Sequence, residues 1–316
     1  MVVATQQVAV GTSDLEVFPL ALGGNVFGWT ADEAATFAVL DAFTAAGGNM
    51  VDSADGYSAW VPGHTGGESE TLIGRWLARR GDRDDVVVST KVSQHPDFRG
   101  LAAANVRAAA EASLIRLGTD RIDVYYAHFD DVSVPLEETV GAFSALVDDG
   151  LVRYVAVSNY TPERIDEWMA VTEREGFHRP VALQPHYSLV ERAFEGGLRE
   201  RAQRYGLGVF PYFALAKGFL AGKYRDDGAT VDSPRADAAR GYLDDRGRRV
   251  LAALDDVAAA HGAPVAAVAL AWLRVQPTVT APIASARTPE QLVDLVASAS
   301  LELTTDEVTQ LSAASA

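Results

Sequence analysis

Four side chains that can take part in proton transfer come directly after short apolar runs of the sequence. Asp52 and Tyr57 follow one run, Lys91 ends a second and His128 ends a third. A continuous apolar run is typical of a parallel strand that is buried on both faces. In barrels of parallel strands, active sites lie at the C-terminal ends of the strands. Each of the four has an ordinary structural role when taken alone, but together they predict one site.

A carboxylate, a phenol, an ammonium and an imidazole suit the donation of a proton to a carbonyl oxygen. The ordinary pKa of tyrosine is about 10, and a cation within about 4–6 Å lowers it. A decrease of about three pH units corresponds to about 4 kcal/mol. We expect Lys91 to lower the pKa of Tyr57, and Asp52 to keep Lys91 charged. His128 would orient the substrate oxygen, and Tyr57 would act as general acid while a hydride reaches the carbonyl carbon.

A regular alternation of strands and helices must position these residues. Eight strand–helix units predict a single-domain α/β protein over residues 1–316, a (β/α)8 TIM barrel with a short N-terminal β-hairpin and a C-terminal helix. A doubly wound sheet is the alternative, because alternation alone does not show closure. Long loops at residues 60–68 and 225–241 are expected to cover the site. The predicted strands are 18–24, 49–54, 85–92, 122–128, 152–159, 181–187, 207–213 and 279–285, and the predicted helices are 32–46, 68–80, 102–117, 136–149, 162–176, 191–205, 246–261 and 289–299.

Composition and charge restrict the classes of function. Of the 316 residues 48% are hydrophobic, which is ample for a large core, and the formal charge is −16. This charge argues against nucleic acid or an anionic membrane as a partner. The absence of cysteine excludes disulfides and thiolate metal sites. No secretion signal is visible, and no apolar run approaches the roughly 18 residues of a membrane helix. We therefore expect a cytoplasmic protein that acts on a small molecule.

An ordered series of motifs resembles the aldo-keto reductase family over almost the whole chain. They are Gly23-Gly24, Asp52-Ser53-Ala54-Asp55-Gly56-Tyr57, Gly67-Glu68-Ser69-Glu70, Ser89-Thr90-Lys91, Arg116-Leu117-Gly118, His128, Val157-Ser158-Asn159, Gln184-Pro185-His186-Tyr187-Ser188-Leu189 and Gly222-Lys223-Tyr224. The resemblance implies an (α/β)8 barrel, NADPH as hydride donor, and a catalytic tetrad made of Asp52, Tyr57, Lys91 and His128.

The resemblance also implies a cofactor site on strands five to eight. No GxGxxG fingerprint follows a strand, so a Rossmann domain is not expected. Lys217, Lys223 and Arg287 instead fall in the loops after strands seven and eight, where barrels commonly bind phosphate. Arg287 would pair with the 2′-phosphate, which favours NADPH and leaves NADH possible, whereas Leu295 replaces the family's adenine-binding asparagine. The implied cofactor-binding residues are Gly24, Asn25, Ser158, Asn159, Gln184, Tyr212, Phe213, Leu215, Lys217, Lys223, Ser285, Arg287, Gln291 and Asp294.

The substrate side is predicted to be aromatic. Trp29, Trp60, Phe129 and Tyr187 could form an apolar pocket above the tetrad, for a small-molecule carbonyl substrate. No metal is expected, because the histidines of the chain lack a carboxylate–histidine ligand spacing. A protein that senses the nicotinamide cofactor is the alternative function, since regulatory subunits of potassium channels share the tetrad. A metal-dependent barrel hydrolase is a third.

Overall fold

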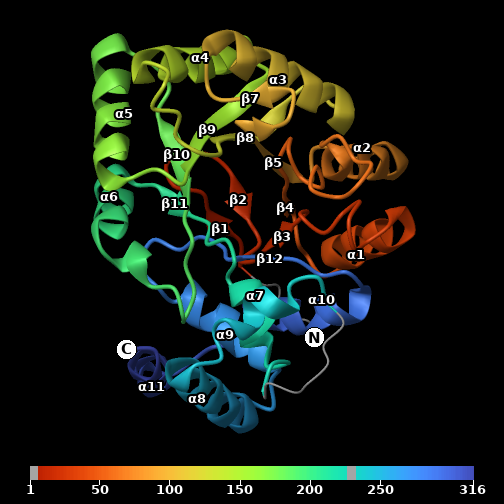
Figure 1. Ribbon diagram of the computed structural model, residues 1–316, viewed down its shortest axis with the longest axis vertical. Helices are drawn as coiled ribbons and strands as arrows, with labels where there is room; N and C mark the ends of the chain where they lie inside the picture. The colour runs from red at the N-terminus through yellow and green to blue at the C-terminus, as the bar shows by residue number, and fades with distance from the viewer. Residues whose placement is uncertain (1–5, 226–232) are drawn as a thin grey trace.

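The computed structural model describes residues 6–225 and 233–316, in which eight parallel strands form a barrel (Figure 1). The hydrogen-bonded order is β11-β10-β9-β8-β5-β4-β3-β12. All eight predicted strands are present, although several are shorter than their apolar runs. Their bounds are β3 (Ala21–Gly23), β4 (Met50–Asp52), β5 (Val87–Val92), β8 (Ile122–Ala127), β9 (Val152–Ser158), β10 (Pro180–Gln184), β11 (Gly208–Val209) and β12 (Ile283–Ala284).

Hydrogen bonds between β11 and the segment that leads into β12 close the barrel. The backbone N–H of Val209 donates to the carbonyl of Thr278 at 3.0 Å, and the N–H of Thr280 returns a bond to Val209 at 2.9 Å. Further along, the N–H of Ile283 donates to the carbonyl of Pro211 at 2.9 Å. These bonds join the two ends of the sheet, so the alternative of a doubly wound sheet is excluded.

The N-terminal hairpin covers the end of the barrel opposite to the predicted site. It consists of the antiparallel strands β1 (Val8–Ala9) and β2 (Glu16–Val17). Val10, Leu15 and Val17 pack in one apolar cluster with inward-facing strand residues. A second and larger cluster fills the space between the strands and the helices. The bottom of the barrel is therefore a packed core, and its open end lies at the C-terminal ends of the strands.

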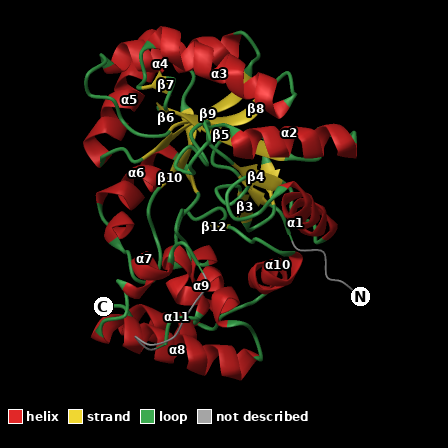
Figure 2. Cartoon of the chain, turned by 45° about the vertical axis from the view of Figure 1, so that its right-hand side comes forward, coloured by secondary structure: helices red, strands yellow, loops and turns green. Residues whose placement is uncertain are grey.

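Helices surround the barrel in the order of the chain, as the turned view in Figure 2 shows. Helix α8 and the C-terminal helix α11 contact each other, and α8 also packs on α9. The bounds are α1 (Glu33–Ala45), α2 (Glu68–Arg80), α3 (Ala103–Leu117), α4 (Leu136–Asp148), α5 (Pro162–Glu175), α6 (Gly197–Tyr205), α7 (Ala236–Arg240), α8 (Asp245–His261), α9 (Val265–Arg274), α10 (Pro289–Val296) and α11 (Thr305–Ala314).

Local sequence signals explain where these helices begin and end. At the start of α5 the side chain of Thr161 accepts a hydrogen bond from the N–H of Arg164, and Pro162 takes the first helical position, which has no need of an N–H. The helix ends at Gly176, whose φ of 71° a residue with a side chain rarely adopts. Between α2 and α3, Gly74 permits close packing, because a Cβ there would lie 2.3 Å from the carbonyl oxygen of Arg116.

Several elements were not predicted from the sequence. They are helices α7 and α9, the hairpin β6 (Gln94–His95) and β7 (Phe98–Arg99), and the 3-10 turn η2 (Ala216–Ala221). The predicted helix 191–205 consists of the 3-10 turn η1 (Ala193–Glu195) and α6, and the predicted helix 289–299 consists of α10 and the 3-10 turn η3 (Ala297–Ala299). Helix α9 has buried residues at eight of its ten positions, so it lacks the polar face by which an amphipathic helix is recognised. Within the described residues no single helix is long and apolar enough to cross a membrane, although α8 and α9, bent by 97°, pass that test as a pair.

Candidate active site

The period of two along each strand brings polar residues to the open end of the barrel. Inward-facing apolar residues near the N-terminal ends of the strands belong to the inner core cluster. The residue two or four positions further on faces the same way, and at the open end it is polar. The inner positions of the strands, in order along the chain, are Met50 and Asp52, Val87 with Ser89 and Lys91, Val124 with Tyr126 and then His128, Ala156 and Ser158, Ala182 and Gln184, and Phe210 followed by Tyr212.

Asp52 and Lys91 form an ion pair that is almost completely shielded from solvent. The Lys91 Nζ lies 2.7 Å from Asp52 Oδ2, and the side chains are 0% and 2% exposed. Lys91 also donates to the carbonyl of Ser53 at 2.6 Å, while Ser89 and Gln184 donate to Asp52 Oδ1 at 2.7 and 3.0 Å. Burial lowers the pKa of Lys91, but Asp52 and then Tyr57 outweigh it and raise the pKa above its ordinary value. Lys91 is therefore a fixed positive charge.

Tyr57 accepts a hydrogen bond from this ammonium group. The Lys91 Nζ is 3.1 Å from the Tyr57 hydroxyl oxygen. The expectation that Lys91 would bring the pKa of Tyr57 below its ordinary value is wrong. Burial raises that pKa, Lys91 lowers it, and Asp52 raises it again, so the result is a pKa above the ordinary 10.0. The phenol is thus fully protonated at neutral pH, as a proton donor must be.

His128 lies beside Tyr57 and is neutral. The two rings are 6.2 Å apart between centroids, at an angle of 74°. Burial, followed by the charge of Lys91, holds the pKa of His128 well below its ordinary value. The buried Nδ1 atom has no hydrogen-bond partner among the described residues. A neutral imidazole can donate one hydrogen bond to a substrate oxygen, which matches the predicted orienting role.

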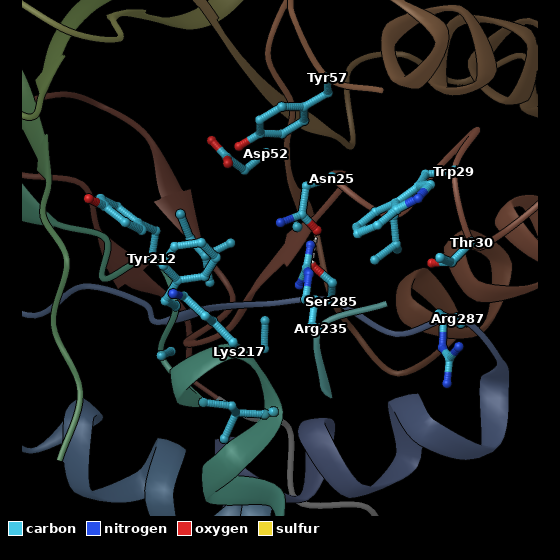
Figure 3. Close-up of a pocket in the computed structure, with 18 of the residues that line it drawn as sticks. Asn25, Trp29, Thr30, Asp52, Tyr57, Tyr212, Lys217, Arg235, Ser285 and Arg287 are labelled. Carbon is cyan, nitrogen blue, oxygen red and sulfur yellow. Dashed lines mark hydrogen bonds between the residues drawn. The ribbon is translucent and has the colours of Figure 1, made fainter. Parts of the chain in front are cut away.

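Most of the predicted site residues line one cavity of about 570 Å³ at the open end of the barrel (Figure 3). Tyr57 and Asp52 lie at one side of this view, with Lys217 and Arg287 further from them. The cavity brings together Asp52, Tyr57 and His128 of the tetrad, Trp29, Trp60 and Phe129 of the predicted substrate pocket, and Asn25, Asn159, Gln184, Tyr212, Phe213, Leu215, Lys217, Lys223, Ser285, Arg287 and Gln291 of the predicted cofactor residues.

Tyr187 is the predicted pocket residue that the structure separates from this cavity. It follows Gln184 by three positions, an odd number, and its side chain faces the helix-side core. There the ring packs on Phe194 and Trp272, and its hydroxyl donates to Glu195 at 2.8 Å. The prediction that Tyr187 belongs to a substrate pocket is therefore not supported.

Three predicted cofactor residues also lie outside the cavity lining. Ser158 is buried and its hydroxyl donates to the carbonyl of Gln184 at 2.9 Å. Gly24 allows close approach of the chain, since a Cβ there would lie 2.8 Å from the Ser69 hydroxyl. Asp294 is exposed on α10, and Leu295 is buried in the core. The position that the family resemblance assigns to an adenine-binding asparagine is thus occupied by a residue of the hydrophobic core.

Four cations line the part of the cavity formed after β11 and β12. They are Lys217, Lys223, Arg235 and Arg287. Arg235 was not predicted; it lies in the described part of the long loop 225–241 and its guanidinium stacks on Trp29 at 5.2 Å. Burial lowers its pKa. Within residues 6–225 and 233–316 no ion pair with a carboxylate is formed by any of the four, so their charges are available to an anionic ligand.

Two of the cofactor-binding residues that the family resemblance implies, Asn159 and Tyr212, form a connected group with His128. The hydroxyl of Tyr212 donates to Asn159 Oδ1 at 2.7 Å, and Asn159 Nδ2 donates to the carbonyl of His128 at 2.9 Å. Asn159 has a left-handed backbone, with φ 57°, which asparagine tolerates better than most residues. A dinucleotide with negative phosphates and a flat amide-bearing ring fits this set of unpaired cations, amides and aromatic rings.

Aromatic side chains form the wall on the other side of the tetrad. The ring of Trp60 meets the rings of Trp29 and Tyr57 edge to face, with 5.5 and 6.1 Å between ring centroids. The ring centroids of Phe129 and His128 are 4.9 Å apart. Trp60 is 51% and Phe129 42% exposed. Two large apolar rings with this exposure beside the Tyr57 phenol indicate a surface that a ligand covers. The described residues hold no group of three histidine, aspartate or glutamate side chains suited to a metal ion.

Comparisons with known proteins agree with this geometry. A model of the aldo/keto reductase family matches residues 19–316. The chain is 35% identical over 304 residues to the uncharacterized oxidoreductase YrpG of Bacillus subtilis, with 93% of this chain and 91% of the relative covered. It is 33% identical to a probable voltage-gated potassium channel subunit beta of rice, Oryza sativa (90% and 88% covered). It is 30% identical to norsolorinic acid reductase B of Aspergillus parasiticus (94% and 80% covered).

Proposed function

Because this chain belongs to the aldo/keto reductase family, we propose that it reduces an aldehyde or ketone to an alcohol with NADPH, and that Tyr57 is the proton donor. The observation that carries the proposal is the buried Asp52–Lys91 pair with its 3.1 Å contact to the Tyr57 hydroxyl. This contact supports Tyr57 as a proton donor, because a tyrosine that only packs at the rim would not need a buried ammonium group beside its hydroxyl.

The residues of the chain provide the protonation half of the reaction. A reduced nicotinamide, when bound, supplies the hydride to the carbonyl carbon. His128 donates a hydrogen bond that holds the carbonyl oxygen beside the Tyr57 hydroxyl. As negative charge develops on that oxygen, Tyr57 transfers its proton to it and becomes a phenolate. Lys91 stabilises the phenolate, since it remains charged next to Asp52. The alcohol therefore receives one hydride and one proton.

The four cations, which form no ion pair with a carboxylate of the described residues, support NADPH over an uncharged ligand. Lys217, Lys223 and Arg235 are available to the pyrophosphate, and Arg287 to a 2′-phosphate. NADH has no 2′-phosphate, so the preference for NADPH should decrease in Arg287→Leu. The proposal requires that wild-type protein binds NADPH, and failure to bind either nicotinamide cofactor would refute it.

Substitution of the proton donor tests the role of Tyr57. Tyr57→Phe removes the hydroxyl and leaves the ring between Trp60 and His128. We expect this variant to quench NADPH fluorescence as the wild type does and to lose at least about two orders of magnitude in turnover, the usual contribution of general acid catalysis. Turnover close to that of the wild type would remove Tyr57 from the acid role.

The aromatic wall supports an apolar, flat carbonyl substrate. The name of the Aspergillus relative describes a reductase, and Trp60 and Phe129 offer exposed ring surface next to the tetrad. In Trp60→Ala we expect kcat/KM to fall by about tenfold for naphthaldehyde, because apolar contact is lost. The same change should affect glyceraldehyde much less. An equal decrease for both substrates would contradict an aryl preference.

A nicotinamide-sensing regulatory protein is the second candidate, favoured by the similarity to the potassium channel subunit. Such a protein would exchange its cofactor slowly and turn over little. Pre-steady-state and steady-state rates with the same aldehyde separate the two functions. Many turnovers per site in the steady state support the reductase, because slow cofactor exchange would limit a sensor to few turnovers.

A further inference from the structure

A histidine stands behind the ring of Tyr212, on the side away from the cavity. The rings of His186 and Tyr212 are stacked, with 5.2 Å between centroids and 15° between planes. His186 does not line the cavity, whereas Tyr212 does. The two residues also form a parallel backbone bridge, supported by the N–H of Tyr212 donating to the carbonyl of Pro185 at 3.0 Å. His186 thus covers part of one face of the Tyr212 ring in an offset stack.

Other contacts fix the Tyr212 ring at its tip and at its edge. Its hydroxyl donates to Asn159 at 2.7 Å. The ring of Phe213 meets Tyr212 edge to face at 5.3 Å and His186 at 5.4 Å. A tyrosine at the rim of a cavity would otherwise be free to rotate about its side-chain bonds, and that freedom would be lost when a ligand stacks on it. Here the contacts with His186, Asn159 and Phe213 fix the orientation of the Tyr212 ring before a ligand binds.

We propose that His186 is a positioning residue, which holds the Tyr212 ring as a preformed floor for the nicotinamide ring of the cofactor. This inference rests on the proposed use of a nicotinamide cofactor. Figure 3 shows Tyr212 and Trp29 on opposite sides of the view, with Asn25 between them. A flat ring lying on Tyr212 would give a stack of three rings, in which His186 is the outermost layer.

The contacts of His186 indicate a stacking role and not a polar one. Its buried Nε2 has no hydrogen-bond partner among the described residues. Burial lowers its pKa, the charge of Glu191 raises it, and Lys217 lowers it, with a net decrease. The imidazole is therefore neutral at neutral pH, and no positive charge opposes an oxidised nicotinamide on the other face of Tyr212. A neutral aromatic ring of similar size should be able to replace it.

The experiment compares dissociation constants for NADPH and for adenosine 2′,5′-bisphosphate, a fragment that has the 2′-phosphate and lacks the nicotinamide. In His186→Ala we expect NADPH to bind about three- to tenfold more weakly, the range expected for a lost aromatic pair. The fragment should bind within about twofold of its wild-type value. His186→Phe keeps a neutral ring and should restore NADPH binding.

Each other outcome contradicts the inference. Unchanged NADPH binding in His186→Ala would show that the stack behind Tyr212 has no effect on the ligand. An equal loss for NADPH and for the fragment would show general damage to the site. Failure of His186→Phe to restore binding would mean that the imidazole nitrogens, not the ring face, matter. If the wild type bound neither NADPH nor the fragment, the proposed cofactor function itself would fail, and the inference with it.

Discussion

The buried pair of Asp52 and Lys91 allows a quantitative prediction about the energetics of the site. Asp52→Asn keeps the shape of the side chain and removes its charge, which leaves the Lys91 ammonium buried without its 2.7 Å partner. Removing one member of a buried ion pair costs about 3–5 kcal/mol. The carbonyl of Ser53 still accepts from Lys91 at 2.6 Å, so we expect the lower end, about 3 kcal/mol.

The same reasoning applies to the other member of the pair. Lys91→Met leaves the Asp52 carboxylate, which still accepts hydrogen bonds from Ser89 and Gln184, and about 3 kcal/mol is again expected. The double variant removes both charges and leaves neither uncompensated. Its destabilisation should be smaller than the sum of the single ones by about 2 kcal/mol or more.

Urea denaturation at neutral pH measures these three free energies of unfolding. For a chain of 316 residues, the free energy of unfolding decreases by about 0.7 kcal/mol per kelvin near the melting temperature. The melting temperature of each single variant should therefore be about 5 °C lower. Circular dichroism of the folded variants controls for a change in fold. Additive effects of the two substitutions would refute the claim that the charges compensate each other in the folded protein.

Three further outcomes follow from particular contacts. The raised pKa of Tyr57 keeps the phenol protonated, so kcat/KM for reduction should stay flat from about pH 6 to about pH 9 and fall only as pH rises through that pKa; a decrease near neutral pH would contradict it. Arg235→Leu should weaken NADPH binding by about tenfold or more and reduce its dependence on salt, whereas Arg225→Leu, which removes a cation paired with a surface carboxylate, should not. Gly74→Ala should lower the free energy of unfolding by about 2 kcal/mol or more, because its Cβ meets backbone at 2.3 Å; Gly141→Ala, with its nearest contact at 3.4 Å, should change it by less than about 1 kcal/mol.

Much of the fold could be predicted from the sequence, because two different periods are visible in it. The strands are continuous apolar runs and most helices are amphipathic, so helix α2 was predicted with the same bounds, Glu68–Arg80. Helix α9 was missed because it is almost entirely buried. Closure of the barrel depends on bonds between residues that are about 70 positions apart, such as Val209 and Thr278, and a strand–helix alternation does not specify them.

The candidate site was predicted in part, and the failures have physical causes. Alternation along the strands places Asp52, Lys91 and Gln184 together, whereas Tyr187, three positions after Gln184, falls on the opposite face. The strand ends predicted a cation near Tyr57 but not how deeply both side chains are buried, so the predicted direction of the Tyr57 pKa shift was wrong. Arg235 reaches the cavity from a long loop whose path no periodic pattern specifies.

The central claim is that this protein transfers a hydride to a carbonyl carbon while Tyr57 protonates the oxygen. A single-turnover experiment tests it most directly: protein preloaded with NADPH is mixed with an aryl aldehyde, and the reduced-nicotinamide absorbance is followed with time. We predict one equivalent of NADPH oxidised per site and one of alcohol formed by the wild type. Tyr57→Phe should bind NADPH equally well and oxidise it at least about a hundredfold more slowly. Wild-type protein that binds NADPH but leaves it reduced in the presence of every carbonyl tested would contradict the claim.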